Sequence, residues 1–227
     1  MIEQDEHEAH LDSWAQESET FIRDGVVCHK RWRESERRVL FLMKEDYATK
    51  QDNDIREKIL RKKKILRKTA GDKPDLGGGT LSVAAQWAFA CQNFESPVSL
   101  KNTKKPDRDA ALRECAWVNL KKTRGESLSS KEQLRAYLEK DGNDGKLRRQ
   151  LELIDPAPQL IICGNTWKLA KEFVWPGKKY DPLFDLTIRI VGGPVVIDFC
   201  HPGARIRHDL MFHSLCSILR GIATEIG

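Results

Sequence analysis

Four short, continuously apolar runs constrain the fold of this chain more than any other feature: RVLFLM at 38–43, CAWVNL at 115–120, QLIICG at 159–164 and PVVIDF at 194–199. Each run has the length of a strand, and stretches with helical periodicity separate them. Strands that are apolar on both sides belong to parallel sheets covered by helices on both faces. The sequence therefore predicts an α/β fold with three layers, α/β/α, around a mainly parallel four-stranded central sheet.

The chain of 227 residues is long enough for one sizeable α/β domain. We expect residues 38–227 to form this domain and residues 1–37 to form a helical extension that packs on it. No apolar run approaches the roughly 20 residues that a membrane span needs, and the acidic N-terminal segment lacks the features of a secretory signal. These observations predict a cytoplasmic, monomeric protein without membrane contact.

The charge is unevenly distributed along the chain. The formal net charge is +5, yet the first twenty residues hold seven acids and neither Lys nor Arg. Residues 54–68 carry eight Lys or Arg against two acids. This segment is either a solvated helix face or a patch that follows nucleic-acid phosphates, and the sequence leaves both interpretations open.

Several enzyme classes lack their motifs in this chain. The six cysteines include no CxxC pair, so we expect reduced thiols, no metal site and no cofactor. The glycines at 77–79 do not fit a phosphate-binding fingerprint, and no GxSxG motif is present. Kinase, P-loop and α/β-hydrolase functions are therefore excluded.

Polar side chains cluster where the predicted strands end. Glu45 follows the first strand, Asn119 ends the second, and His201 follows the fourth. The carboxyl ends of parallel strands form one edge of the sheet, which is where open α/β sheets bind their ligands. A carboxylate, an amide and an imidazole are thus expected on one rim.

These residues, in this order, resemble the motifs of the uracil-DNA glycosylase superfamily over most of residues 38–220. Residues 43–47, MKEDY, correspond to a first motif that reads Gly-Gln-Asp-Pro-Tyr in the best-known branch. Asn119 corresponds to the base-reading Asn, and residues 201–205, HPGAR, correspond to the closing His-Pro-Ser-Pro-Leu. The chain departs from the family in having Glu45 for Asp, Gly-Ala for Ser-Pro and Arg205 for the leucine that enters the duplex. It also lacks the cysteine pattern of the iron–sulfur branches.

The resemblance implies a DNA N-glycosylase that flips a base out of double-stranded DNA and leaves an abasic site. It implies catalytic roles for Glu45 and His201. Trp87 is expected in the core rather than as a stacking platform. The remaining expected contacts are Tyr47, Asn119, Lys44 and Gly79 with the base and nucleotide, and Arg205, Lys121, Lys122 and Arg207 with the DNA backbone or stack.

The identity of the excised base is a separate hypothesis. The altered motifs and the insertions at 71–82 and 95–110 favour a reshaped pocket, similar to that of divergent bacterial members that act in antiviral defence. This favours a modified cytosine such as glucosylated hydroxymethylcytosine in phage DNA. The alternatives are a uracil repair glycosylase and a catalytically inactive module that binds DNA or a nucleotide. A metal-dependent nucleotide hydrolase is disfavoured because few carboxylates follow the strands.

Overall fold

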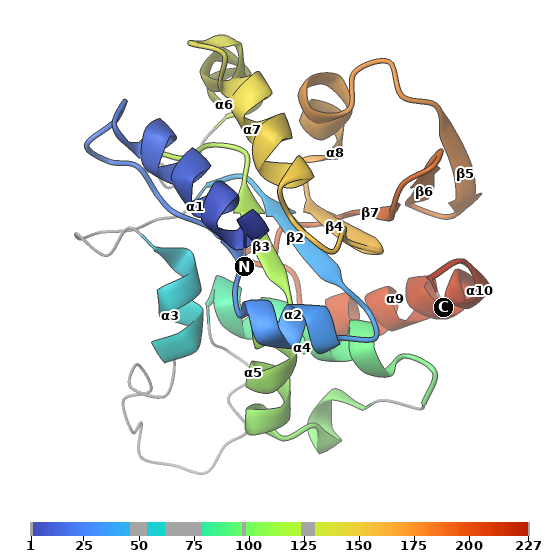
Figure 1. The fold of residues 1–227 in the computed structure, drawn as a ribbon. Coiled ribbons are helices and arrows are strands. Elements are labelled where there is room, and N and C mark those ends of the chain that lie inside the picture. Colours follow the sequence, from blue (N-terminus) through green and yellow to red (C-terminus); the bar gives the residue numbers. More distant parts are fainter. Residues whose placement is uncertain (1, 46–53, 62–78, 97–98, 124–129, 227) are drawn as a thin grey trace.

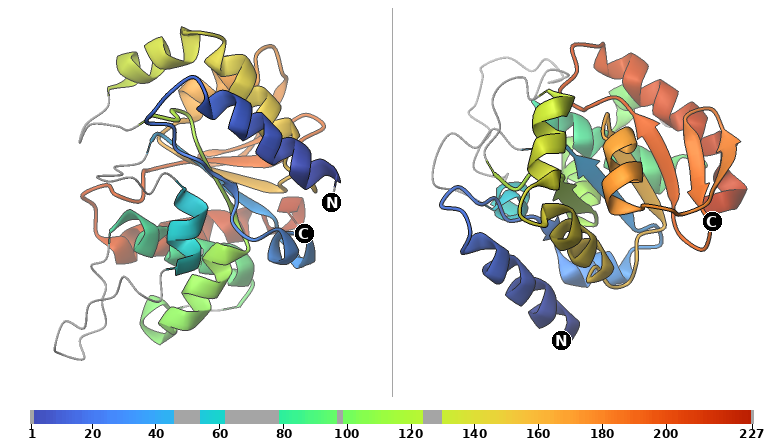
Figure 2. Two further views of the ribbon diagram at one scale, coloured as in Figure 1. Left: turned by 60° about the vertical axis from the view of Figure 1, so that its left-hand side comes forward. Right: turned by 90° about the horizontal axis from the view of Figure 1, so that it is seen from above.

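A mixed sheet forms the centre of the molecule in the computed structural model, which describes residues 2–45, 54–61, 79–96, 99–123 and 130–226. In this part of the chain the sheet has seven strands in the order β1-β3-β2-β4-β7-β6-β5. Helices cover both of its faces, so the molecule has three layers (Figures 1 and 2). The strands are β1 (Gly25–Val26), β2 (Val39–Met43), β3 (Ala116–Asn119), β4 (Leu160–Gly164), β5 (Tyr180–Phe184), β6 (Thr187–Ile190) and β7 (Val195–Phe199).

The four predicted strands are confirmed as β3, β2, β4 and β7, which lie side by side and run parallel. The prediction of a four-stranded sheet was incomplete. Strand β1 pairs antiparallel with β3 at one edge, and the antiparallel pair β5–β6 extends the sheet beyond β7. The added strands lack long apolar runs, since β1 has two residues and β5 is partly exposed and contains Pro182.

Two helical layers enclose the sheet (Figure 2). One layer holds α3 (Ile55–Arg61), α4 (Thr80–Asn93), α5 (Lys105–Arg113), α9 (His208–Gly221) and α10 (Ala223–Ile226). The other holds α1 (Ile2–Ala15), α6 (Lys131–Glu139), α7 (Asn143–Glu152) and α8 (Trp167–Leu169), the last of which continues into the π-helical segment η3 (Ala170–Val174). The remaining helical pieces are α2 (His29–Glu34) and the 3-10 turn η2 (Leu100–Asn102).

Side chains of the central strands alternate between the two cores. Val39, Phe41 and Met43 of β2 face α4 and α9, whereas Leu40 and Leu42 face the opposite layer. This alternation is the two-residue period of a strand. It also decides toward which layer each polar side chain at the strand ends points.

The N-terminal segment is less helical than predicted and more deeply built into the domain. Helix α1 is followed by strand β1, and Trp14, Phe21 and Val26 are buried in the same core as α6 and α7. Likewise, the predicted loop at 95–110 ends early, because α5 begins at Lys105. In the N-terminal segment tertiary contacts decide the local structure, whereas α5 begins with Pro106 in its first turn, a local signal for a helix start.

Within the described ranges, no helix is both long and apolar enough to cross a membrane. All six cysteines are free thiols, and four of them are buried.

Candidate functional site

The strand order places a topological switch point between β2 and β4. From β2 the chain continues to β3 on one side, whereas from β4 it continues through β5 and β6 to β7 on the other. Ligands of open α/β sheets bind outside the carboxyl ends of the strands at such a point. Lys44 and Glu45 follow β2 at this point, and Thr166 follows β4 and donates a hydrogen bond from Oγ1 to the Leu42 carbonyl oxygen at 2.7 Å.

Glu45 is a buried carboxylate on this edge. The β2–β3 ladder continues past the strands, because Leu120 N donates to Met43 O at 2.8 Å and Lys121 N donates to Lys44 O at 2.9 Å. Glu45 is the second residue after β2, beside these two bonds. Its side chain is 3% exposed, and Oε2 accepts no hydrogen bond from the described residues. The Lys121 ammonium lies 3.9 Å from that oxygen.

Asn119 lies beside Met43 in the ladder and is fully buried. Its Oδ1 accepts a hydrogen bond from Trp117 Nε1 at 3.1 Å, and its main-chain N–H donates to Asp24 Oδ2 at 2.7 Å. The amide Nδ2 has no hydrogen-bond partner in the described part of the chain. Alternation puts Asn119 on the same face of the sheet as Trp117, the face toward which Met43 also points.

His201, two residues beyond β7, is held as a neutral donor. The main-chain N–H of Gly203 donates to its Nδ1 at 3.0 Å. Because an amide N–H can only donate, Nδ1 is the acceptor and the imidazole proton resides on Nε2. Burial, together with the nearby Lys44 cation, lowers the pKa of His201 to about 4.

Gly164, the last residue of β4, lets β2 and His201 approach each other. A Cβ at this position would lie 2.4 Å from Met43 Sδ and 3.5 Å from His201 Cδ2. On the other side of the imidazole, a Cβ at Gly203 would lie 3.0 Å from Thr80 Oγ1, at the start of α4. Gly79, which is exposed, precedes Thr80 and so lies at the rim of the site.

Lys122 does not belong to this rim, which corrects the expectation that it contacts DNA. Its side chain is 0% exposed, and Nζ lies 2.6 and 2.8 Å from the two carboxylate oxygens of Asp24. Gln150 Nε2 donates to the same carboxylate at 2.7 Å. Because successive side chains point to opposite faces, Lys122 points into the interior and its neighbour Lys121 points toward Glu45.

The other expected DNA contacts fall into two groups. Arg205 and Arg207 are exposed on the loop after β7, and Arg207 Nε donates to Asp209 Oδ1 at 3.1 Å. Tyr47 and residues 62–68 of the basic segment lie outside the described residues. Within α3, Arg56 is paired with Asp54 and Glu8, so this cation is engaged inside the protein.

Trp87 is fully buried and packs edge-on against Phe199, with ring centroids 5.0 Å apart, which confirms its place in the core. Reasoning from the sequence missed Ile206, which is 48% exposed beside Arg205. It also gave no sign of the partners of Asn119. Spacing alone offered one clue, because Trp117 and Asn119 are two apart on a strand and so share a face.

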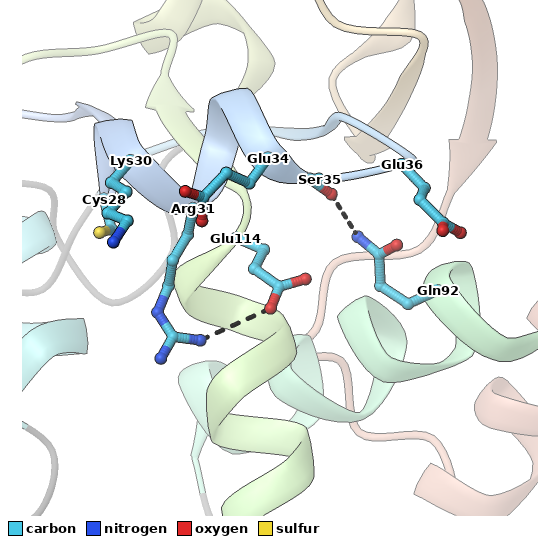
Figure 3. A pocket seen from close by; sticks show the side chains of 8 residues that line it. All are labelled: Cys28, Lys30, Arg31, Glu34, Ser35, Glu36, Gln92 and Glu114. Carbon is cyan, nitrogen blue, oxygen red and sulfur yellow. Dashed lines mark hydrogen bonds and ion pairs between the residues drawn. The ribbon is translucent and has the colours of Figure 1, made fainter.

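A polar pocket of about 660 Å³ lies at the opposite edge (Figure 3). Ser35 and Glu114 line it and precede β2 and β3, so it lies at the amino ends of these strands. Four of its polar side chains are partnered with one another: Arg31 pairs with Glu114 at 3.5 Å, and Gln92 Nε2 donates to Ser35 Oγ at 3.2 Å. The carboxyl edge, where buried polar atoms have no such partner, is the better candidate.

No group of His, Cys, Asp and Glu side chains in the described part of the chain is arranged to hold a metal ion. No protein-family model, curated protein or solved structure matches this chain. The carboxyl edge carries a buried carboxylate, an amide N–H donor and a neutral imidazole donor.

Proposed function

We propose that this chain is a DNA glycosylase that hydrolyses the N-glycosidic bond of a flipped-out, modified pyrimidine and leaves an abasic site. The observation that carries the proposal is the Glu45 carboxylate, which is buried at the switch point and has an oxygen free of hydrogen bonds from the described residues. A carboxylate placed in this way serves a reaction rather than the fold, because structural carboxylates that are buried are normally hydrogen-bonded.

Cleavage of an N-glycosidic bond builds positive charge on the sugar, as glycoside hydrolysis does. A carboxylate near the anomeric carbon stabilises that charge and orients or deprotonates the attacking water. In this proposal Glu45 has both roles. Lys121 places a positive charge 3.9 Å from this carboxylate, close to the strand end.

The departing base takes up the negative charge, so it needs hydrogen-bond donors. His201 supports this step because it is neutral and carries its proton on Nε2, which can donate to a pyrimidine O2. Asn119 supplies a second donor, the unpartnered Nδ2. Because His201 stays neutral at physiological pH, it stabilises the leaving base as a hydrogen-bond donor rather than as a cation.

A base inside a duplex is out of reach, so the nucleotide must first be flipped out of the stack. Exposed Arg205 and Arg207 on the loop after β7 are positioned to hold the phosphates and the vacated stack, with half-buried Lys44 and Lys121 closer to the sugar. Phosphate contacts of this kind contribute affinity without sequence preference.

We infer that the base is a cytosine with a bulky substituent, in the favoured case glucosylated hydroxymethylcytosine of phage DNA. The support is local: the glycine-rich segment ends at Gly79 beside the His201 turn, and a Cβ at Gly79 would meet no described atom within 4 Å. The described residues leave room at this rim for a sugar on the base. Plain uracil is the alternative substrate.

The decisive experiment incubates the purified protein with unmodified, uracil-containing and glucosyl-hydroxymethylcytosine-containing duplexes, and detects abasic sites by alkaline strand breakage. Glu45→Gln removes the carboxylate while keeping its shape. Glu114→Gln is the matched control, because Glu114 is a partly buried glutamate at the opposite edge of the sheet. Breakage that Glu45→Gln abolishes and Glu114→Gln retains is the expected result.

Breakage of the uracil duplex alone would replace the modified base by uracil. If none of the duplexes is broken but all are bound, the chain is a DNA-binding module and the proposed chemistry is wrong.

A further inference from the structure

The orientation of the Asn119 side-chain amide is fixed by chemistry. The indole Nε1–H of Trp117 can only donate a hydrogen bond, so the Asn119 atom that faces it at 3.1 Å must be the oxygen. The amide nitrogen consequently points the other way. It is buried and has no hydrogen-bond partner among the described residues.

Further contacts keep this arrangement rigid. The Asn119 main-chain N–H is bonded to Asp24, and Asp24 is itself held by Lys122 and Gln150. The Trp117 ring packs against Phe41, with ring centroids 5.7 Å apart, and is 4% exposed. Both side chains are buried, and the amide cannot exchange its oxygen and nitrogen without losing the Trp117 bond.

We propose that Trp117 determines base specificity by locking Asn119 as a hydrogen-bond donor toward the substrate. This inference rests on the proposed function, since it concerns the base bound beside Glu45 and His201. Trp117 acts through Asn119 and is a positioning residue, whereas Asn119 is the group that contacts the base.

A locked donor discriminates because cytosine and uracil present opposite groups on their Watson–Crick edge. At position 4 cytosine has an amino donor and uracil a carbonyl acceptor, whereas at position 3 cytosine has an acceptor and uracil an N–H donor. A fixed Nδ2–H therefore favours one base over the other at either position. An amide that can rotate suits both, and discrimination is then lost.

The test compares two duplexes that differ only on this edge: glucosylated hydroxymethylcytosine and glucosylated hydroxymethyluracil, each at one position. The readouts are the ratio of kcat/KM and the ratio of Kd for the two duplexes. Trp117→Phe keeps the ring and removes the donor. Benzothienylalanine at position 117, in which sulfur replaces the N–H, keeps the full shape should Trp117→Phe fold poorly. Trp32→Phe is the control, because it removes another buried indole bond, to the Pro156 carbonyl at 2.9 Å.

We expect the native protein to favour one of the two duplexes by at least about tenfold, the usual effect of an unmatched buried hydrogen-bonding group, and to favour the cytosine duplex where Nδ2 donates to position 3. Both changes at Trp117 should bring the ratio close to one, whereas Trp32→Phe should leave it unchanged. A ratio that persists without the Trp117 N–H, or a native ratio near one, overturns the inference while leaving the glycosylase intact. Absence of any excision overturns the proposed function. In that case the Kd ratio alone tests whether the amide fixed by Trp117 discriminates between the two bases.

Discussion

At the scale of single residues, the chemistry of the carboxyl edge is set by near neighbours in the fold. Gly203 decides which nitrogen of His201 holds the proton, and Lys44 together with burial keeps that imidazole neutral. Trp117 decides which way the Asn119 amide faces. The properties of these side chains thus depend on neighbours that do not themselves react.

The pKa of His201 offers a direct check. Its folded-state value of about 4 lies below the usual 6.5, so the unfolded chain binds the proton more readily between these values. The free energy of unfolding should therefore fall as the pH drops from about 6.5 to about 4. Lys44→Ala should raise the His201 pKa, because the change removes a repelling cation.

The measurement is an NMR titration of the His201 ring carbon Cε1 in both proteins, with the exposed His213 as an internal reference. A midpoint near 6.5 in the native protein would contradict the burial of the imidazole.

Gly164→Ala should destabilise the protein by about 1–3 kcal/mol, because the added methyl group overlaps Met43 Sδ in a packed interior. Met43→Ala alone should cost about 2–5 kcal/mol through the cavity that it leaves. The double variant should be more stable than the sum of the two changes predicts, since each relieves the other. Urea denaturation of the four proteins measures this coupling, and strict additivity would show that Gly164 and Met43 do not compete for space.

At the scale of elements, a buried ion pair joins the N-terminal segment to the end of β3. Asp24 and Lys122 are both fully buried, and burial lowers the pKa of the Lys122 ammonium against the pull of the carboxylate. Ile22 N also donates to Lys122 O at 2.6 Å. This hydrogen bond and the Asp24–Lys122 ion pair therefore hold the segment before β1 against the end of the strand that carries Asn119.

Asp24→Ala should lower the free energy of unfolding by about 3–5 kcal/mol, because it leaves the Lys122 charge buried without a partner. The pair Asp24→Asn with Lys122→Met should recover most of this loss, since it removes both charges and keeps an oxygen for the Asn119 N–H. Thermal and urea unfolding measure the difference. A double variant no more stable than Asp24→Ala would show that the packing of these residues matters more than their charges.

The elements that could be predicted from the sequence are those whose signal is local. The strands β2, β3, β4 and β7 are continuous apolar runs, and the break between α6 and α7 falls on Gly142, which has a φ of +68°. Strand β1 is only two residues long and exists through its pairing with β3.

The site shows the same division. Glu45, Asn119 and His201 could be placed on one edge because parallel strands share their carboxyl ends. The burial of Lys122 could not be predicted, because it depends on Asp24, which lies 98 residues away in the sequence.

At the scale of the whole molecule, several acids of the N-terminal segment are paired with cations of the protein itself. Acids of α1 form ion pairs with cations elsewhere in the fold: Glu6 pairs with Arg149 at 3.6 Å, and Glu8 lies 3.8 Å from Arg23. The cations on the loop after β7 are exposed at the strand ends. The uneven charge of the sequence thus becomes a fold with positive side chains around the candidate site.

Arg205→Ala should weaken DNA binding at low salt and reduce the slope of log K against log salt by about 1, as expected for one lost phosphate contact. Lys30→Ala is the matched control, because Lys30 is exposed at the amino ends of the strands. Binding isotherms at several salt concentrations give both slopes. An equal loss of DNA affinity and of salt slope in the two variants would mean that DNA binds without preference for the carboxyl edge.

The order of the strands has a consequence for the synthesis of this protein. Strand β2 lies between β3 and β4, and all five of its residues are 0% exposed in the finished fold. Both of its neighbours are translated later, and β4 ends only at Gly164. At typical rates of translation, the apolar residues of β2 therefore remain without their neighbouring strands for on the order of ten seconds. During that interval the nascent chain is a natural client for a chaperone, and slowing translation before residue 164 should increase its aggregation.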